Sequence, residues 1–238
     1  MGIAERRERE KLQRQNDILD AAEKVFFKKG FKAATIDDVA EAAELSKGTI
    51  YLYFKSKVSL YLGIELRANK LLKKKFESAL ANRPDEISRL RAIGQAYFEF
   101  SEKYPDYFKA MAFFETLDDD DLRQLDDDPL GQKCHEAGMQ ILSMISDAVR
   151  SGIDKGIIRP ECHPMRTAIL LWATSNGVIT LLKNKGEHFA TMHDANPAAI
   201  IDDYFRMINH WLLVDDSPEN TAQEKRPTDG DNPAGNDK

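Results

Sequence analysis

The sequence predicts an all-α protein of about nine helices, because apolar residues recur at helical spacing along most of the chain. Ile18, Ala21, Ala22, Val25 and Phe26 form one such stripe, whereas the alternation typical of β-strands is hard to find. Hydrophobic residues make up 42% and charged residues 31% of the 238 residues, which is typical of a globular protein with a buried core. The 13 glycines and 9 prolines are too few for a collagen-like or wholly disordered chain.

Capping and breaking residues delimit these helices. Thr35, Ser46 and Ser56 have N-cap chemistry, and Asp38 follows Thr35 at the spacing of a capping box. Glycine tolerates the left-handed turn that ends a helix, and three glycines are expected to do so: Gly30, Gly156 and Gly186. The predicted helices cover residues 9–29, 35–43, 46–54, 56–81, 85–103, 106–115, 129–155, 164–185 and 197–214.

Charge divides the chain into two unlike parts. The net charge is −6, but residues 1–75 hold 17 Lys and Arg against 11 Asp and Glu, whereas residues 76–238 hold 17 against 29. This asymmetry indicates a basic module that meets an anion and an acidic module with another role, and chance clustering is the alternative. The aspartate-rich stretch 117–128 is expected to be a solvated loop or a frayed turn.

The composition favours a cytoplasmic protein. Two cysteines cannot form a disulfide framework. Residues 1–14 are charged throughout and lack the apolar segment of a signal peptide. No uncharged apolar run reaches about 18 residues, so no membrane span is expected.

Residues 35–54 have the pattern of a helix-turn-helix. Two short helices are separated by the turn 44–46, and Ala40 and Ala43 allow the second helix to cross closely over the first. The second helix of such a pair enters the major groove, so double-stranded DNA is the expected partner. Five apolar residues are expected to form the shared core of the pair: Ile36, Val39, Leu45, Ile50 and Phe54.

The exposed positions of the second helix fit a DNA groove. A groove about 12 Å wide admits a helix that leads with short or cationic side chains. Tyrosine hydroxyls can donate hydrogen bonds to phosphate oxygens. A lysine in the first turn of a helix is unfavourable with the helix dipole, so a nearby anion such as a phosphate would explain it. The alternative is a helix pair that only packs. The pattern alone makes these residues candidate DNA contacts: Ser46, Lys47, Gly48, Thr49, Tyr51, Tyr53, Lys55 and Lys57.

Two stretches, Thr35-Ile-x-x-Val-Ala and Ala43-x-Leu-Ser-Lys-Gly-Thr-Ile-Tyr-x-Tyr-Phe-x-Ser-Lys57-x-x-Leu60, resemble the signature of the TetR (tetracycline repressor-like) transcriptional regulators. The resemblance implies a homodimeric cytoplasmic repressor. One residue departs from the pattern, because the family usually has glycine where this chain has Glu44, and glutamate in a left-handed turn costs about 1 kcal/mol relative to glycine. The family's DNA contacts fall on Thr35, Ser46, Lys47, Gly48, Thr49, Tyr51, Tyr53 and Lys57.

The resemblance also implies a division of the chain. Residues 1–57 are expected to form the DNA-binding domain, and helix 58–81 links it to the body. Residues 82–214 are expected to bind a ligand and to dimerise. Residues 215–238 are polar, rich in Pro, Gly, Asn and Asp, and are expected to be a disordered tail.

Aromatic and methionine side chains concentrate in the middle helices. The resemblance makes some of them walls of a pocket for a small, mostly apolar effector, although an ordinary core explains most of them individually. The pocket candidates are Tyr97, Phe98, Phe108, Phe113, Phe114, Met139, Met144 and Trp172.

Two segments near the carboxyl end, 165–182 and 198–213, are apolar enough to be buried on several sides. They are expected to form half of a four-helix bundle with a second copy, and a purely internal core is the alternative. A twofold dimer suits a palindromic operator. The interface candidates are Trp172, Ala173, Gly177, Ile201, Tyr204, Phe205, Ile208 and Trp211.

Two other functions compete with a ligand-responsive repressor. One is a DNA-binding architectural protein without a ligand. The other is a small helical enzyme that uses Cys134 and His135, or Cys162 and His163, as nucleophile and base. Adjacent side chains on a helix point about 100° apart, so neither pair is suited to share a metal ion. No triad order, P-loop or dinucleotide motif is present, so no catalytic residue, metal or cofactor is predicted.

Overall fold

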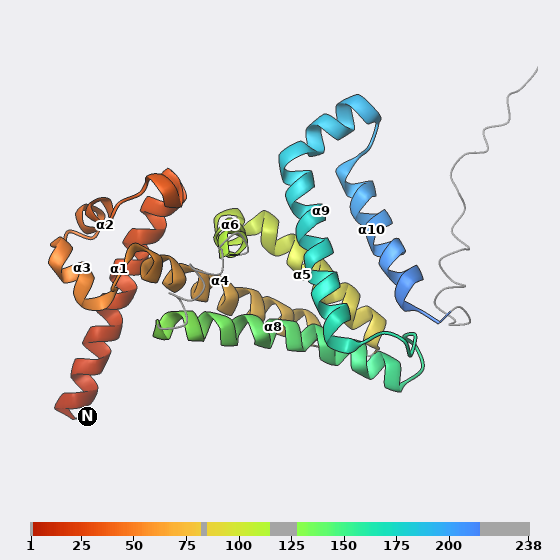
Figure 1. The fold of residues 1–238 in the computed structure, drawn as a ribbon, viewed down its shortest axis with the longest axis horizontal. Helices are drawn as coiled ribbons and strands as arrows, with labels where there is room; N and C mark the ends of the chain where they lie inside the picture. The colour runs from red at the N-terminus through yellow and green to blue at the C-terminus, as the bar shows by residue number, and fades with distance from the viewer. Residues whose placement is uncertain (1, 82–84, 115–127, 215–238) are drawn as a thin grey trace, which may run out of the picture. The chain divides into compact units, whose positions relative to one another are not determined.

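The computed structural model describes residues 2–81, 85–114 and 128–214, and in these ranges the chain forms nine α-helices and no β-strand (Figure 1). This confirms the all-α prediction. The helices are α1 (Ile3–Ala33), α2 (Ile36–Ala42), α3 (Lys47–Tyr53), α4 (Lys57–Leu80), α5 (Glu86–Lys103), α6 (Pro105–Phe114), α8 (Pro129–Asp154), α9 (Pro164–His193) and α10 (Pro197–Leu212).

Helix α1 begins earlier than its apolar stripe predicts. It starts at Ile3 rather than near residue 9, because Glu, Arg, Lys and Gln favour a helix even where no apolar face exists. The Gly2 amide donates to Glu5 Oε2 at 2.9 Å and closes the first turn. At the other end, Gly30 interrupts the helical conformation with φ 76°, as its predicted role as a helix stop requires.

Helix α9 continues past its predicted stop. Gly156 does follow α8 with φ 69°, but Gly186 lies inside α9, which ends at His193. Gly186 is buried, and a Cβ at this position would lie 3.2 Å from Cγ of Pro197. This glycine therefore allows the start of α10 to approach α9 closely, and the prediction of a helix end there is wrong. Nearly all of the aspartate-rich stretch and all of residues 215–238 lie outside the described residues.

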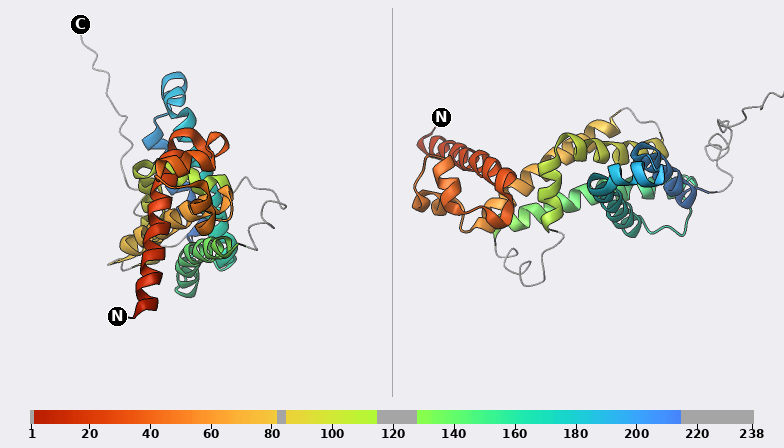
Figure 2. Two further views of the ribbon diagram at one scale, coloured as in Figure 1. Left: turned by 90° about the vertical axis from the view of Figure 1, so that its left-hand side faces the viewer. Right: turned by 90° about the horizontal axis from the view of Figure 1, so that it is seen from above.

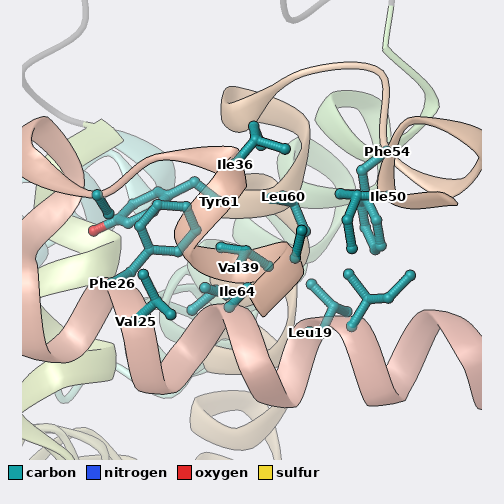
Figure 3. Packing of buried hydrophobic residues seen from close by; sticks show 14 of the residues in the cluster. Leu19, Val25, Phe26, Ile36, Val39, Ile50, Phe54, Leu60, Tyr61 and Ile64 are labelled. Atoms are coloured by element: carbon teal, nitrogen blue, oxygen red, sulfur yellow. The ribbon is translucent and has the colours of Figure 1, made fainter. Parts of the chain in front are cut away.

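The chain divides into two compact units, Met1–Arg83 with Ala92–Met144, and Pro84–Arg91 with Ile145–Lys238. In the first unit, α1 to α4 pack around one apolar cluster, the head core (Figure 3). Val39, Ile50 and Leu60 are fully buried in it, and Leu45 packs at its edge. Ala110 of α6 is also fully buried there, so α6 belongs to the same core.

In the second unit, α9 and α10 lie side by side (Figures 1 and 2). The buried Tyr204 of α10 places its hydroxyl 2.8 Å from Thr174 Oγ1 and 2.9 Å from Ser175 Oγ, both on α9. Buried hydroxyls need such partners, so these bonds fix the register between the two helices.

Glu44 lies in the turn between α2 and α3 with φ 54°, in the left-handed region. We expect Glu44→Gly to raise the free energy of unfolding by about 1 kcal/mol, because a Cβ disfavours this conformation. Urea denaturation measures the change. Glu41→Gly removes the same charge from α2 and is expected to lower stability by up to about 1 kcal/mol. Equal effects of the two substitutions would mean that the turn is not strained.

Candidate DNA-binding surface

Capping hydrogen bonds fix the start of α2. The Asp38 amide donates to Thr35 Oγ1 at 3.1 Å, and the Thr35 amide donates to Asp38 Oδ2 at 2.9 Å, which confirms the capping box. Lys29 of α1 donates to Asp38 Oδ1 at 2.7 Å. The hydrogen bonds from Lys29 and then from Thr35 lower the pKa of Asp38 to about 2, so the carboxylate stays charged and holds α2 to α1.

A second cap fixes α3. The Thr49 amide donates to Ser46 Oγ at 3.1 Å, and the two hydroxyls lie 2.8 Å apart. Gly48 follows in the first turn, where an added Cβ would meet only Ser46 Oγ, at 3.7 Å. The fold therefore leaves room for a side chain at Gly48, and the glycine keeps this side of α3 flat and open.

The lysines of the predicted site have different surroundings. Lys47 Nζ lies 2.9 Å from Asp37 Oδ2, and this hydrogen bond raises the pKa of Lys47. Lys57 Nζ lies 4.5 Å from the ring centroid of Phe31 and donates to the Lys32 carbonyl oxygen at 3.3 Å. Lys47 is thus held at the outer surface of the helix pair, whereas Lys57 ties the start of α4 to the end of α1.

The aromatic candidates also differ. Tyr51 is exposed, whereas Tyr53 packs partly against the head core. Sequence reasoning missed Leu52, which is 81% exposed on α3. Leu52 is two residues from both Ile50 and Phe54, so it lies on the side of the helix opposite to these buried residues. This spacing could have identified Leu52 from the sequence. All nine predicted DNA contacts are exposed or partly exposed: Thr35, Ser46, Lys47, Gly48, Thr49, Tyr51, Tyr53, Lys55 and Lys57.

A polar network joins α1 to α4 and α6 within the first unit. Arg67 of α4 donates to Asp20 at 2.7 Å and to Glu23 at 2.9 Å, both on α1. The Tyr107 hydroxyl of α6 donates to the same Glu23 oxygen at 2.9 Å, and its ring packs edge-on against Phe27 at 5.5 Å. Burial and then the bond to Glu23 raise the pKa of Tyr107 to about 12, so it remains a donor.

The pocket candidates do not share one environment. Tyr97, Phe98 and Phe108 are buried, and the rings of Tyr97 and Phe108 lie 5.8 Å apart. Met139 is 39% exposed, and Met144 is partly buried. The ligand pocket stays a prediction. Of the remaining pocket candidates, Trp172 is partly buried. The side chains of Phe113 and Phe114 lie outside the described residues.

The dimer candidates separate into two groups. Tyr204 and Phe205 are buried inside the second unit, and the dimer interface itself stays a prediction. Trp172, Ile201 and Ile208 are partly exposed. Seven of the exposed apolar residues of the two helices define what we call the α9–α10 face: Ile169, Leu170, Ala173, Gly177, Leu181, Met207 and Trp211. Apolar patches of this kind mark interaction sites.

Helix α9 is also long and apolar enough to cross a membrane, by length and composition alone. Only 22% of its most apolar stretch is buried inside the chain. One helix of this kind is weak evidence for a membrane span, because core helices and signal sequences pass the same test.

The cysteines have little nucleophilic character. Cys134 Sγ donates to the Leu62 carbonyl oxygen at 3.2 Å, and burial, with Glu65 nearby, raises its pKa far above the ordinary value. Burial also raises the pKa of Cys162. A thiol that stays protonated is a poor nucleophile, which disfavours the enzyme alternative. Within the described ranges, no group of three or more His, Cys, Asp and Glu side chains is placed to hold a metal ion.

Comparison with known proteins agrees with this geometry. The model of the bacterial regulatory proteins of the tetR family matches residues 18–64, and the model of the tetracyclin repressor-like C-terminal domain matches residues 90–207. The uncharacterised HTH-type transcriptional regulator YhgD of Bacillus subtilis is 30% identical over 160 residues, which are 67% of this chain and 79% of YhgD. The HTH-type transcriptional activator FasR of Mycolicibacterium smegmatis is 38% identical over 90 residues, which span 38% of this chain and 41% of FasR.

A solved structure extends the likeness of fold to most of the chain. The transcriptional regulator FadR from Bacillus subtilis, in complex with stearoyl-CoA, has a TM-score of 0.62 at 18% identity, and the match covers 82% of this chain and 97% of FadR. The helix-turn-helix surface on an all-helical chain defines a DNA-binding transcriptional regulator. The chain belongs to the TetR family.

Proposed function

We propose that this protein is a cytoplasmic repressor that binds a palindromic operator as a homodimer and is released by a small, mostly apolar molecule. The surface of α3 carries the proposal. Ile50 anchors the helix in the head core, and Lys47, Gly48 and Tyr51 face outward from its exposed side. A capped helix with a flat, cationic leading turn fits the major groove.

The head is joined to the helices that would respond to a ligand. Ala110 of α6 is buried in the head core, and Tyr107 of α6 and Arg67 of α4 both bind Glu23 of α1. A shift of α6 or α4 therefore carries the head with it. Helix α4 has 24 residues, or about 36 Å, so a small change of its angle moves the head by several ångströms. Two recognition helices must lie about 34–36 Å apart, or a multiple, to read one face of DNA.

The chemistry of the relatives supports an apolar effector. FadR is crystallised with stearoyl-CoA, whose long acyl chain is apolar. In this chain, the buried rings of Tyr97, Phe98 and Phe108 supply apolar surface in the middle helices. FasR is named an activator, so the sign of regulation needs its own measurement.

Selection of genomic DNA fragments by the purified protein tests the proposal. A reproducible palindrome near a promoter is the expected result. Transcript levels from that promoter are expected to rise when the protein is absent, and a fall would make it an activator. Failure to enrich any sequence would contradict operator binding.

The two lysines are expected to affect DNA binding differently. Lys57→Ala should weaken specific and non-specific binding alike and lower the salt slope by about 1 per contact, because a lysine at a helix start suits phosphate. Lys47→Ala should instead relax the base preference at one position of each half-site. Salt titrations and repeated sequence selection measure both. If Lys57→Ala changes the sequence preference and leaves the salt slope unchanged, these roles are wrong.

Ligand and DNA are expected to weaken each other's binding by the same factor, because coupling free energy is reciprocal. A screen of apolar compounds against the operator complex, with thermal shift in parallel, identifies effectors. The affinity of an effector is then measured with and without operator. Compounds that stabilise the protein and leave operator affinity unchanged would favour the architectural alternative.

A further inference from the structure

The first part of α1 extends away from the head core. Its buried residues begin at Ile18, and every side chain from residue 3 to residue 14 is exposed. At 1.5 Å per residue, this extension is about 18 Å long. The helix-turn-helix surface does not use it.

The extension carries a stripe of basic side chains. Arg7, Lys11 and Arg14 follow one another at intervals of four and three residues, so they share one face of the helix. The same spacing continues to Ile18 and Val25, which are buried in the head core. The basic stripe therefore lies on the same side of α1 as the apolar residues with which this helix packs into the head core.

This face is directed to the side on which α3 lies. Ile50 of α3 and Phe54, the C-cap of that helix, lie close to Leu19, at the end of the buried stretch nearest the extension. Phe26 and Tyr61 lie towards the other end of that stretch (Figure 3). The extension thus runs past α3, and its N-terminal end projects beyond the helix pair (Figure 1).

The charges on the stripe are not used within the described part of the chain. Arg7, Lys11 and Arg14 make no ion pair or hydrogen bond there, whereas Arg6, off the stripe, pairs with Glu10 at 2.8 Å. The exposed apolar residues Ile3 and Leu12 differ by nine positions and lie on opposite sides of the helix, so they form no face for a lipid surface.

We propose that the stripe Arg7–Lys11–Arg14 binds the phosphate backbone of DNA beside the groove that α3 enters. The proposal rests on the placement of α3 proposed above. The stripe is about 10 Å long, which matches about three phosphates of one strand at 3.4 Å of helix axis per charge. Guanidinium groups suit phosphate because they donate two parallel hydrogen bonds. The contact adds affinity and leaves the base preference to α3.

The test compares two double variants of the full-length protein with equal loss of charge. Arg7→Gln with Arg14→Gln removes the stripe, and Arg6→Gln with Arg9→Gln removes two arginines that lie off it. Gln and Arg have similar helix propensities, so circular dichroism and urea denaturation should match the unmodified protein. The probe is a random-sequence duplex of about 40 base pairs, titrated with salt.

The stripe variant is expected to lower the salt slope by about 3–4, because a dimer loses up to four contacts at about 0.9 each. Its affinity should fall by at least about tenfold at moderate salt, and the control should change the slope by less than about 1. On a selected operator, the stripe variant should keep its base preference. Equal slopes for the two variants, or binding of the stripe to phosphatidylglycerol vesicles in place of DNA, would overturn the proposal. If the unmodified protein shows no salt-dependent DNA binding, the proposed function itself fails.

Discussion

Gly177→Arg is expected to convert the protein into a folded monomer. Gly177 lies in the middle of the α9–α10 face, between Ala173 and Leu181, and nothing lies within 4 Å of a Cβ built there. The chain itself therefore accommodates an arginine, which also raises helix propensity by nearly 1 kcal/mol relative to glycine. In a dimer that uses this face, the same arginine places a charge and a long side chain between two closely packed helices.

Sedimentation gives the oligomeric state, and operator binding gives the consequence. Operator affinity should fall by about a hundredfold or more, because the two half-sites are no longer bound by one linked species. Gly138→Arg is the matched control, because Gly138 lies within α8 and also has nothing within 4 Å of a built Cβ. The control should remain a dimer. A Gly177→Arg protein that is still a well-folded dimer would place the interface elsewhere.

Gly48→Ala is expected to make the protein more stable and its DNA binding weaker. Glycine in a helix is less stable than alanine by about 0.5–1 kcal/mol, and the Cβ at Gly48 meets only an ordinary contact at 3.7 Å. Unfolding in urea should therefore shift to higher concentration. If α3 lies against the bases and backbone of the groove, the added methyl group prevents this close approach, and affinity should fall by about tenfold or more.

The opposite signs of the two effects are the informative result. Gly138→Ala, in α8, should show a similar gain in stability and unchanged DNA binding. If Gly48→Ala binds the operator as tightly as the unmodified protein, the first turn of α3 does not lie close to DNA.

The helix-turn-helix was predictable because its signals are local. Thr35 and Ser46 are caps that act within three residues, and Ile36, Val39 and Ile50 follow a helical period, so each could be identified from its neighbours in sequence. The positive φ of Glu44 was also accessible, because the family pattern has glycine there.

What could not be predicted depends on contacts between distant residues. From its sequence, Gly186 resembles the glycine that ends a helix, whereas in the structure it lies within α9 and allows Pro197 to approach closely. Tyr204 belongs to the apolar stripe of α10, but its hydroxyl also forms a hydrogen bond with that of Thr174 on α9. The role of Tyr107 likewise depends on Glu23, which lies far away in the sequence.

The buried position of Ala110 also limits how this regulator is recombined with others. A chimera that exchanges the amino-terminal domain at the middle of α4 would pack the head core against the α6 of another regulator in place of Ala110. A residue of another size at this buried position leaves a void or overpacks the core, and either lowers stability. Exchanging α6 together with α1–α4 keeps the core intact, so the unit of modular design is the DNA-reading domain with this helix from the body.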